Sequence, residues 1–176
     1  TCPDSVSAEA TSSSGAAVSY AAAVATDNGD VSISITYDVA SGSTFAIGTT
    51  AVTATATDDN SNVSTCTFNV TVTDNTDPTI TSCPADQTVS SVCGLSAPNQ
   101  TGGATVTWNA ATATDTGDDS VAITYSHASG SIFGMGTTTV TVTATDDEGN
   151  DTTCAFDVTV VDTTAPDITC PANIST

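Results

Sequence analysis

The sequence contains no lysine and no arginine, whereas aspartate and glutamate together number 20, so the formal net charge is −20 at pH 7. Phosphate binding needs basic side chains, and their absence excludes nucleic acid as a partner. It also excludes every ion pair with lysine or arginine. The carboxylates can be offset only by water, hydrogen bonds or bound cations, which makes metal ions the expected partners.

Long apolar runs are also absent. No stretch approaches the roughly 18 apolar residues of a membrane-spanning helix, so no membrane span is expected in this segment. Nothing has the period of a helix either. Apolar residues instead alternate with threonine at Val140, Val142 and Ala144, and alternation resumes from Cys154 to Val160. The pattern predicts a β-hairpin over residues 137–162, whose tip is acidic and contains glycine.

This hairpin occurs twice, because the chain is an internal repeat. Trp108 falls on Tyr20 and Cys154 falls on Cys66, in both cases 88 positions apart, and Cys-Pro opens each copy. Many short strands separated by turn signals predict an all-β fold and favour a sandwich over a barrel. The predicted divisions are a first repeat at 1–76, a second repeat at 77–164, and at 165–176 the first strand of a third repeat or an inter-subunit strand.

The repeated residues also form a family pattern. Each copy carries Ala-Thr-Asp, then Gly-Ser-x-Phe-x-x-Gly-Thr-Thr, and ends with Cys-x-Phe-x-Val-x-Val-x-Asp. This pattern resembles the HYR (hyalin repeat) module over most of both repeats. The resemblance implies tandem immunoglobulin-like β-sandwiches in extracellular proteins that are associated with adhesion and matrix rather than catalysis. The lack of basic residues and the presence of Cys93 depart from the usual pattern.

Six cysteines without zinc-type spacing predict disulfides and an extracellular or cell-surface location. In a sandwich of about seven strands the first and last strands run parallel. Cys2 is therefore expected near Cys66, and Cys83 near Cys154.

Cys93 and Cys170 remain, and two alternatives stay open for them. Either they bond to each other across the boundary to residues 165–176, or one of them pairs outside this chain.

Catalysis is the function that the sequence argues against most directly. His127 is the only histidine that could serve a nucleophile as a base, and its counterpart in the first copy is Val39. The paired carboxylates crowd turns and lack an aromatic-lined cleft that would hold a sugar. Trp108 is expected in the core, because another large aromatic residue, Tyr20, occupies the equivalent position in the first repeat. The prediction is that the protein is not an enzyme.

Five Asn-x-Ser/Thr sequons are candidate glycosylation sites. A chain so rich in threonine also makes such sequons by chance. The favoured acceptors lie in predicted turns, at Asn62, Asn99 and Asn150; the others are Asn69 and Asn173.

Acidic residues gather in three stretches that the sandwich brings to one end of the second repeat: the linker, the turn between the second and third strands, and the hairpin tip. Calcium takes about six to eight oxygen ligands, which aspartate, asparagine and backbone carbonyls supply. The plainer interpretation is that these residues only form turns, but the absence of basic side chains favours calcium. The predicted ligands are Asp74, Asp77, Asp115, Asp118, Asp146 and Asp147, with an equivalent half-site at Asp27, Asp30, Asp58 and Asp59.

These features predict an extracellular structural protein whose tandem repeats form a fibre, filament or surface stalk, rigidified by calcium and disulfides. Its expected partners are neighbouring repeats of the same array or further copies of itself joined head to tail. The alternative is a cell-adhesion module that binds a protein or glycan, and such a module would expose an apolar or aromatic patch on one repeat.

Overall fold

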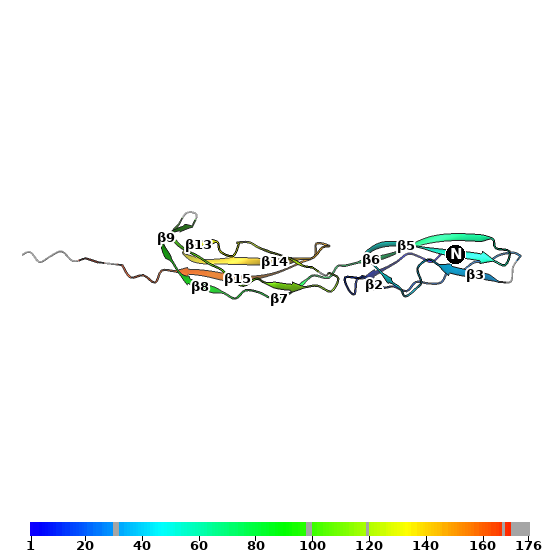
Figure 1. Cartoon of the computed structure of the whole chain (residues 1–176), viewed down its shortest axis with the longest axis horizontal. Helices are drawn as coiled ribbons and strands as arrows, with labels where there is room; N and C mark the ends of the chain where they lie inside the picture. The colour runs from blue at the N-terminus through cyan, green and yellow to red at the C-terminus, as the bar shows by residue number, and fades with distance from the viewer. Residues whose placement is uncertain (30–31, 98–99, 119, 167, 170–176) are drawn as a thin grey trace, which may run out of the picture. The chain divides into compact units, whose positions relative to one another are not determined.

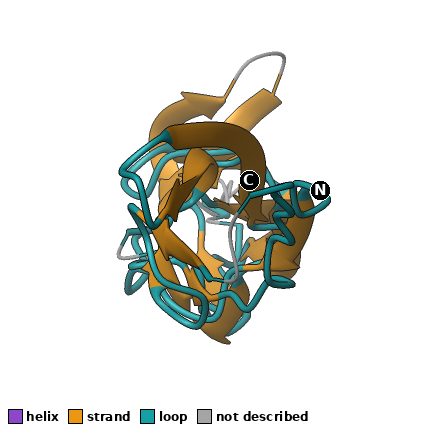
Figure 2. Ribbon diagram, turned by 90° about the vertical axis from the view of Figure 1, so that its right-hand side faces the viewer, coloured by secondary structure: helices purple, strands orange, loops and turns teal. Residues whose placement is uncertain are grey.

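The computed structural model describes the chain except residues 30–31, 98–99, 119, 167 and 170–176, and over 93–101 it describes no side chains. The described residues form 15 β-strands and no helix (Figures 1 and 2). Within these ranges, no helix long and apolar enough to cross a membrane is found. The chain divides into two compact units: unit 1 contains Thr1–Thr79, Ala113–Ala122 and Ala144–Thr152, and unit 2 contains Ile80–Thr112, Ile123–Thr143 and Thr153–Thr176.

The main sheet of unit 1 has four strands in the order β1-β6-β5-β3. These strands are β1 (Val6–Glu9), β3 (Ile33–Tyr37), β5 (Gly48–Asp58) and β6 (Val63–Thr73). A second sheet pairs β2 (Ala16–Ala17) with β4 (Thr44–Phe45). The first strand, β1, runs parallel to the last, β6, with Val6 opposite Val70. This pairing of first and last strands is the one that an immunoglobulin-like sandwich requires.

The core of unit 1 follows from the alternation in β5 and β6. Their inward positions are fully buried, with Val52 and Val70 at 0% exposure and Val72 at 1%. The Tyr20 ring meets Phe68 edge to face, with ring centroids 4.8 Å apart, and its hydroxyl donates to the carbonyl of Val39. The outward threonines leave the opposite face polar, as expected for an antiparallel sheet with one solvated face.

The second repeat is built in the same way, and its sheet has the order β12-β14-β15-β8. Its strands are β8 (Gln87–Ser90), β12 (Ala122–Tyr125), β14 (Gly136–Thr145) and β15 (Asp151–Val161). Again the first of them, β8, runs parallel to the last, β15. Trp108 takes the place of Tyr20, with its ring 5.0 Å from that of Phe156. The predicted all-β fold of tandem immunoglobulin-like sandwiches is confirmed.

Two further sheets complete the second repeat. One has the order β13-β10-β9, and the other pairs β11 with β7. The strands are β7 (Thr79–Ser82), β9 (Val92–Ala97), β10 (Gln100–Thr105), β11 (Thr112–Thr114) and β13 (Ile132–Gly134). Strands β9 and β10 pair antiparallel, and they contain the stretch that the first repeat lacks.

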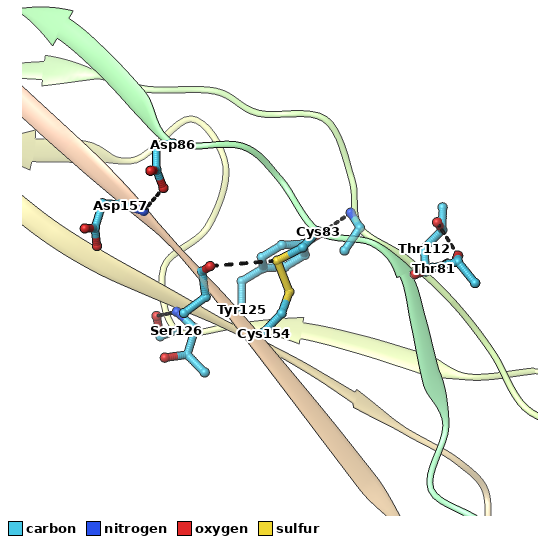
Figure 3. The surroundings of a disulfide bond; sticks show 11 residues. Thr81, Cys83, Asp86, Thr112, Tyr125, Ser126, Cys154 and Asp157 are labelled. Carbon is cyan, nitrogen blue, oxygen red and sulfur yellow. Dashed lines mark hydrogen bonds between the residues drawn. A yellow bond between two sulfur atoms is a disulfide. The ribbon is translucent and has the colours of Figure 1, made fainter.

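Two disulfides tie the stretch before β1 to β6 and the stretch before β8 to β15, at the expected pairs. Cys2 is bonded to Cys66, with Cα atoms 5.9 Å apart, and Cys83 is bonded to Cys154, with Cα atoms 6.4 Å apart. Figure 3 shows the second bond beside the Tyr125 ring. Such bonds are those of an extracellular protein, because they form and persist in oxidising compartments. The Cys93–Cys170 pairing lies outside the described residues.

The first disulfide is expected to supply much of the stability of its repeat. It closes a loop between residues 64 positions apart, and a loop of that size stabilises by about 4 kcal/mol on the chain-entropy estimate. We expect Cys2→Ala with Cys66→Ala to lower the free energy of unfolding of the first repeat by about this amount. Urea unfolding followed by amide NMR in β5 would measure it.

The matched control replaces Cys83 and Cys154, which are 71 positions apart. It should destabilise the second repeat equally, as followed by Trp108 fluorescence, and leave the first repeat unchanged. A loss below about 1 kcal/mol in both repeats would show that their cores suffice without the bonds.

The carboxylate of Asp38, in unit 1, predicts that the stability of the first repeat depends on pH. The backbone N–H of Thr53 donates to Asp38 Oδ1 at 2.8 Å, and this bond, together with a weaker one from Val39, holds the pKa of Asp38 below its ordinary value. A carboxyl group whose pKa is lower in the folded than in the unfolded state stabilises the folded state. This stabilisation is fully present above the unfolded-state pKa of about 4, and it is lost as the pH falls through the folded-state pKa. In the second repeat Ser126 Oγ accepts the same bond, from Thr141 N–H at 3.0 Å.

We therefore expect Asp38→Ser to flatten the acid limb of the stability curve of the first repeat between about pH 5 and pH 2. Ser126→Asp should steepen that limb in the second repeat. Denaturant titrations at pH 7 and pH 3 would measure both, and equal acid sensitivity of all three proteins would contradict the assignment.

Candidate metal centre

The tip of the β14–β15 hairpin is shaped by the side chain of Asp146, which is only 6% exposed. Asp146 Oδ1 accepts the backbone N–H groups of Gly149 and Asn150, both at 2.7 Å, and Oδ2 accepts the Asn150 side-chain N–H at 2.8 Å. Burial alone would raise the pKa of Asp146, but the hydrogen bonds from Asn150 and Gly149 outweigh it and lower the pKa. The group is therefore a fixed anion at neutral pH.

Asp74, directly after β6, is buried at 4% exposure. Its Oδ1 accepts the backbone N–H of Thr76 at 3.0 Å, and its backbone carbonyl accepts the Asn150 side-chain N–H at 3.3 Å. Its Oδ2 is buried and has no hydrogen-bond partner among the described groups. A buried carboxylate oxygen without a partner is costly, so this atom needs an explanation that turn formation does not give.

The space beside Asp74 is shaped by a glycine. A Cβ placed on Gly117 would lie 1.7 Å from Asp74 Oδ2, so no larger residue fits without displacing the carboxylate or the turn. The turn itself is held by Asp115, whose Oδ1 accepts the Gly117 N–H at 2.7 Å. Close approach of the chain explains the glycine here, since its backbone has no special conformation.

Glu148 completes an acidic cluster with these two aspartates. Asp74, Asp146 and Glu148 each place a carboxylate oxygen within 4.8 Å of the others. Desolvation raises the pKa of Glu148, and the nearby carboxylates of Asp118, Asp146, Asp74 and Asp147 raise it further. The Glu148 side chain is exposed, so this ligand could rearrange, whereas the two aspartates are held in place.

The three side chains fit a hard divalent cation. Oxygens on opposite sides of a calcium ion at about 2.4 Å are about 4.8 Å apart, and the three carboxylate oxygens lie within that distance of one another. Calcium prefers carboxylate oxygens, and the unpartnered Asp74 Oδ2 is the donor that such an ion would satisfy. Backbone carbonyls or water would have to supply the remaining ligands.

The other predicted ligands of this end act mainly in the turns. Asp118 Oδ2 accepts the backbone N–H of Asp147 at 2.7 Å, and Asp115 caps the turn at Gly117. Asp77 and the Asp147 side chain are exposed. In the described part of the chain, the structure thus gathers Asp74 and Asp146 in one three-carboxylate group and leaves these four residues outside it.

The proposed half-site of the first repeat has the same turns without the cluster. Asp58 Oδ1 accepts the N–H groups of Asn60 and Asn62 at 2.9 and 2.8 Å, and Asp27 Oδ1 accepts that of Gly29 at 2.8 Å. Asp59 is exposed, and Asp30 lies outside the described residues. No group of three carboxylates is found at this end among the described side chains.

Sequence reasoning missed two residues: Glu148 as a candidate ligand, and Gly117 as the residue that lies against the Asp74 carboxylate. At the hairpin tips the prediction kept the acidic residues found in both copies, and the counterpart of Glu148 is Asn60. The available signal was the run of three consecutive acidic residues at the second tip, where the first tip has two.

The favoured glycosylation candidates also have structural roles. The Asn62 amide donates to Asp58 Oδ2 at 2.7 Å, and the Asn150 amide donates to both Asp146 and Asp74. A glycan on Asn150 would have to replace one of its two bonds. Asn69 is exposed, while Asn99 and Asn173 lie outside the described residues. Glycosylation stays a prediction.

The fold and the disulfides define a class, the tandem immunoglobulin-like β-sandwich of extracellular proteins. Within that class, the family model for the HYR domain matches residues 1–72 and 73–160. The chain belongs to the HYR domain family, as the resemblance in its sequence predicted.

Two curated relatives agree with this assignment. The chain is 34% identical to hyalin from Strongylocentrotus purpuratus over 167 residues, covering 92% of this chain and 13% of that protein. It is 32% identical to hyalin from Lytechinus variegatus over 160 residues, covering 89% of this chain and 29% of that one. Among solved structures, Drosophila N-cadherin EC1-4 matches at 15% identity with a TM-score of 0.39, covering 92% of this chain and 50% of that chain.

The close approach at Gly117 gives a direct test of the site's packing. Gly117→Ala should force the Asp74 carboxylate or the 115–118 turn to move, at a cost of about 1–3 kcal/mol. The matched control is Gly29→Ala at the equivalent position, where the nearest atom to an added Cβ lies 3.6 Å away. Thermal unfolding in chelator should show a lower melting temperature for the first variant alone. Equal effects of both would show that Gly117 does not constrain Asp74.

Proposed function

We propose that the chain is a non-enzymatic structural segment of an extracellular protein, in which tandem HYR repeats build a fibre, filament or surface stalk stiffened by calcium. The observation that carries the proposal is the buried, unpartnered Oδ2 of Asp74 within a cluster of three carboxylates. Because the chain spans only 13% and 29% of the two hyalins, the role of the whole protein is part of the proposal.

The proposed ligands come from separate parts of the sequence. Asp74 follows β6, the last strand of the first repeat, whereas Asp146 and Glu148 belong to the hairpin tip of the second repeat. Calcium would replace repulsion among three carboxylates by attraction to one ion, with no basic side chain competing. The Thr76 N–H and the Asn150 amide already orient the two aspartates. The segment after β6 would then be fixed to the β14–β15 hairpin.

A structural role is also supported by how the only histidine is used. His127 Nδ1 lies 3.1 Å from Ser126 Oγ, a pairing that a serine nucleophile would need. However, Ser126 Oγ accepts the backbone N–H of Thr141, and its counterpart Asp38 accepts the equivalent N–H of Thr53. The serine therefore has the structural task that a carboxylate performs in the other repeat.

The adhesion alternative receives less support. Among the described residues, the exposed large apolar side chains are Val24, Val63, Val92, Ile132 and Ile168. All five are aliphatic, and an aromatic patch of the kind that anchors interfaces is missing from this set.

The calcium proposal predicts a response of the full chain to the ion. At a hundredfold excess over the dissociation constant, calcium should stabilise by about 3 kcal/mol. Small-angle scattering should show lower flexibility in calcium than in chelator, and the melting temperature should rise. Asp74→Asn and Glu148→Gln should each weaken binding at least tenfold, as measured by calorimetry.

Asp59→Asn is the charge-matched control, because it removes one exposed carboxylate from the tip of the first hairpin. It should leave the calcium response nearly unchanged. If calcium changes neither the scattering nor the melting temperature of the unmodified chain, the cluster is not a calcium site. If Asp59→Asn weakens binding as much as Glu148→Gln, the ion is held by net charge alone.

A further inference from the structure

The side chain of Glu9 joins the end of β1 to the segment that follows β6. Glu9 is the last residue of β1 and lies opposite Thr73 of β6 in the parallel pair. Its Oε1 accepts the backbone N–H of Asn75 at 2.6 Å, and its Oε2 accepts the Asn75 side-chain N–H at 2.9 Å. The Thr76 hydroxyl donates a longer bond to Oε1, at 3.4 Å. Glu9 therefore clamps the two residues that directly follow Asp74.

The donors that face Glu9 determine what its carboxylate can do. The backbone N–H of Asn75, and after it the Asn75 side chain, hold the pKa of Glu9 below its ordinary value, so the group is an anion at neutral pH. Among the described residues, Glu9 lies outside the group of three carboxylates that contains Asp74. Since both of its oxygens are engaged by donors, Glu9 is suited to orienting residues 74–76 rather than to binding an ion itself.

The clamped residues form the turn that positions the Asp74 carboxylate. Asp74 Oδ1 accepts the Thr76 N–H at 3.0 Å, and Oδ2 is the buried oxygen without a hydrogen-bond partner among the described groups. Thr76 thus contacts Asp74 through its backbone N–H and Glu9 through its hydroxyl. A movement of the turn away from Glu9 would therefore also move the carboxylate.

The second repeat contains the same turn without a carboxylate clamp. There the Thr164 N–H donates to Asp162 Oδ1 at 2.8 Å. The parallel pairing of first and last strands places Ser90 at the position of Glu9, and Ser90 Oγ accepts a single bond from the Thr163 hydroxyl at 3.1 Å. A carboxylate is therefore not needed to form the turn. Among the described side chains, it accompanies the turn whose aspartate belongs to the acidic cluster.

We propose that Glu9 is a positioning residue of the candidate calcium site, which clamps residues 74–76 so that Asp74 keeps Oδ2 free for the ion. The ion belongs to the proposed function, on which this role rests, whereas the clamp is present in the chain without metal. A ligand that is already held in place loses less conformational freedom on binding, so the clamp should strengthen calcium binding. Because Glu9 is exposed, water competes for its bonds, and the expected gain in affinity is about threefold.

The test exchanges donor and acceptor across the clamp in the full chain. Glu9→Leu removes every acceptor, and Asn75→Asp places a second carboxylate against that of Glu9. Each change should open the clamp, whereas Asn75→Asp combined with Glu9→Gln reverses donor and acceptor and should close it again. In chelator, hydrogen-exchange protection of the residue 75 amide should fall about three- to tenfold in both single variants and return in the double variant.

The signals of Gly117 report on the Asp74 carboxylate without any ion, because the two residues are in close contact. In chelator, the Gly117 proton shifts should change in both single variants and return in the double variant. The matched control is Thr163→Asp, which adds a charge to the equivalent turn of the second repeat and should change neither readout. Gly117 shifts that stay the same in all variants would overturn the proposal, whether or not calcium binds.

Calorimetric titration with calcium separates position from charge. The two single variants change the net charge in opposite directions, so charge alone would make Glu9→Leu weaken binding and Asn75→Asp strengthen it. Positioning instead predicts that both weaken binding about threefold and that the double variant recovers it. Opposite changes would overturn the role of Glu9. If the unmodified chain binds no calcium, the proposed function fails, and the Gly117 shifts in chelator still decide whether Glu9 positions Asp74.

Discussion

Every carboxylate in this protein must be satisfied without a basic side chain, and the turns are arranged around that constraint. Backbone N–H groups take the place of lysine and arginine as donors: Asp27, Asp38, Asp58, Asp115, Asp118 and Asp146 each accept at least one. Such bonds fix the geometry of the turn that supplies them. Asp74 also accepts one such N–H, but its second oxygen is buried and has no hydrogen-bond partner among the described groups.

The same constraint explains which residues replace one another between the repeats. Asp38 and Ser126 accept equivalent N–H groups, and so do Ser5 and Asp86. Both residue types offer an oxygen at the required place, so the turn survives the exchange while the local charge changes. Charge is therefore the more variable property and hydrogen bonding the more constant one. The acidic cluster includes Glu148 of the second hairpin tip, and the equivalent position in the first tip is Asn60, which is uncharged.

The sequence predicted the fold because the alternation of apolar and polar residues directly reports which face of each strand is buried. Alternation over 137–162 and its copy located the hairpins, and the parallel first and last strands located the disulfides.

The acidic site was less predictable. Periodicity says which face of a strand is buried, but it does not give the direction of side chains at a hairpin tip. Asp115 and Asp118 are used to hold turns, a role that composition cannot distinguish from ligation. The close contact between Gly117 and Asp74 joins residues 43 positions apart, and no local pattern reports it.

The stretch from Asp74 to Ser82 contains two structural features close together in the sequence. It begins with the carboxylate that lacks a donor and ends with β7, which covers the edge at β11. Pro78 between them is fully buried, and its ring fixes the backbone at one dihedral, so the carboxylate and the strand are separated by a short and stiff spacer. An ion that restrains Asp74 would therefore also restrict the positions open to β7. Under the proposed function, such a linker would transmit restraint from one repeat to the next, because it would provide both a ligand to the cation site and a strand to the following sandwich.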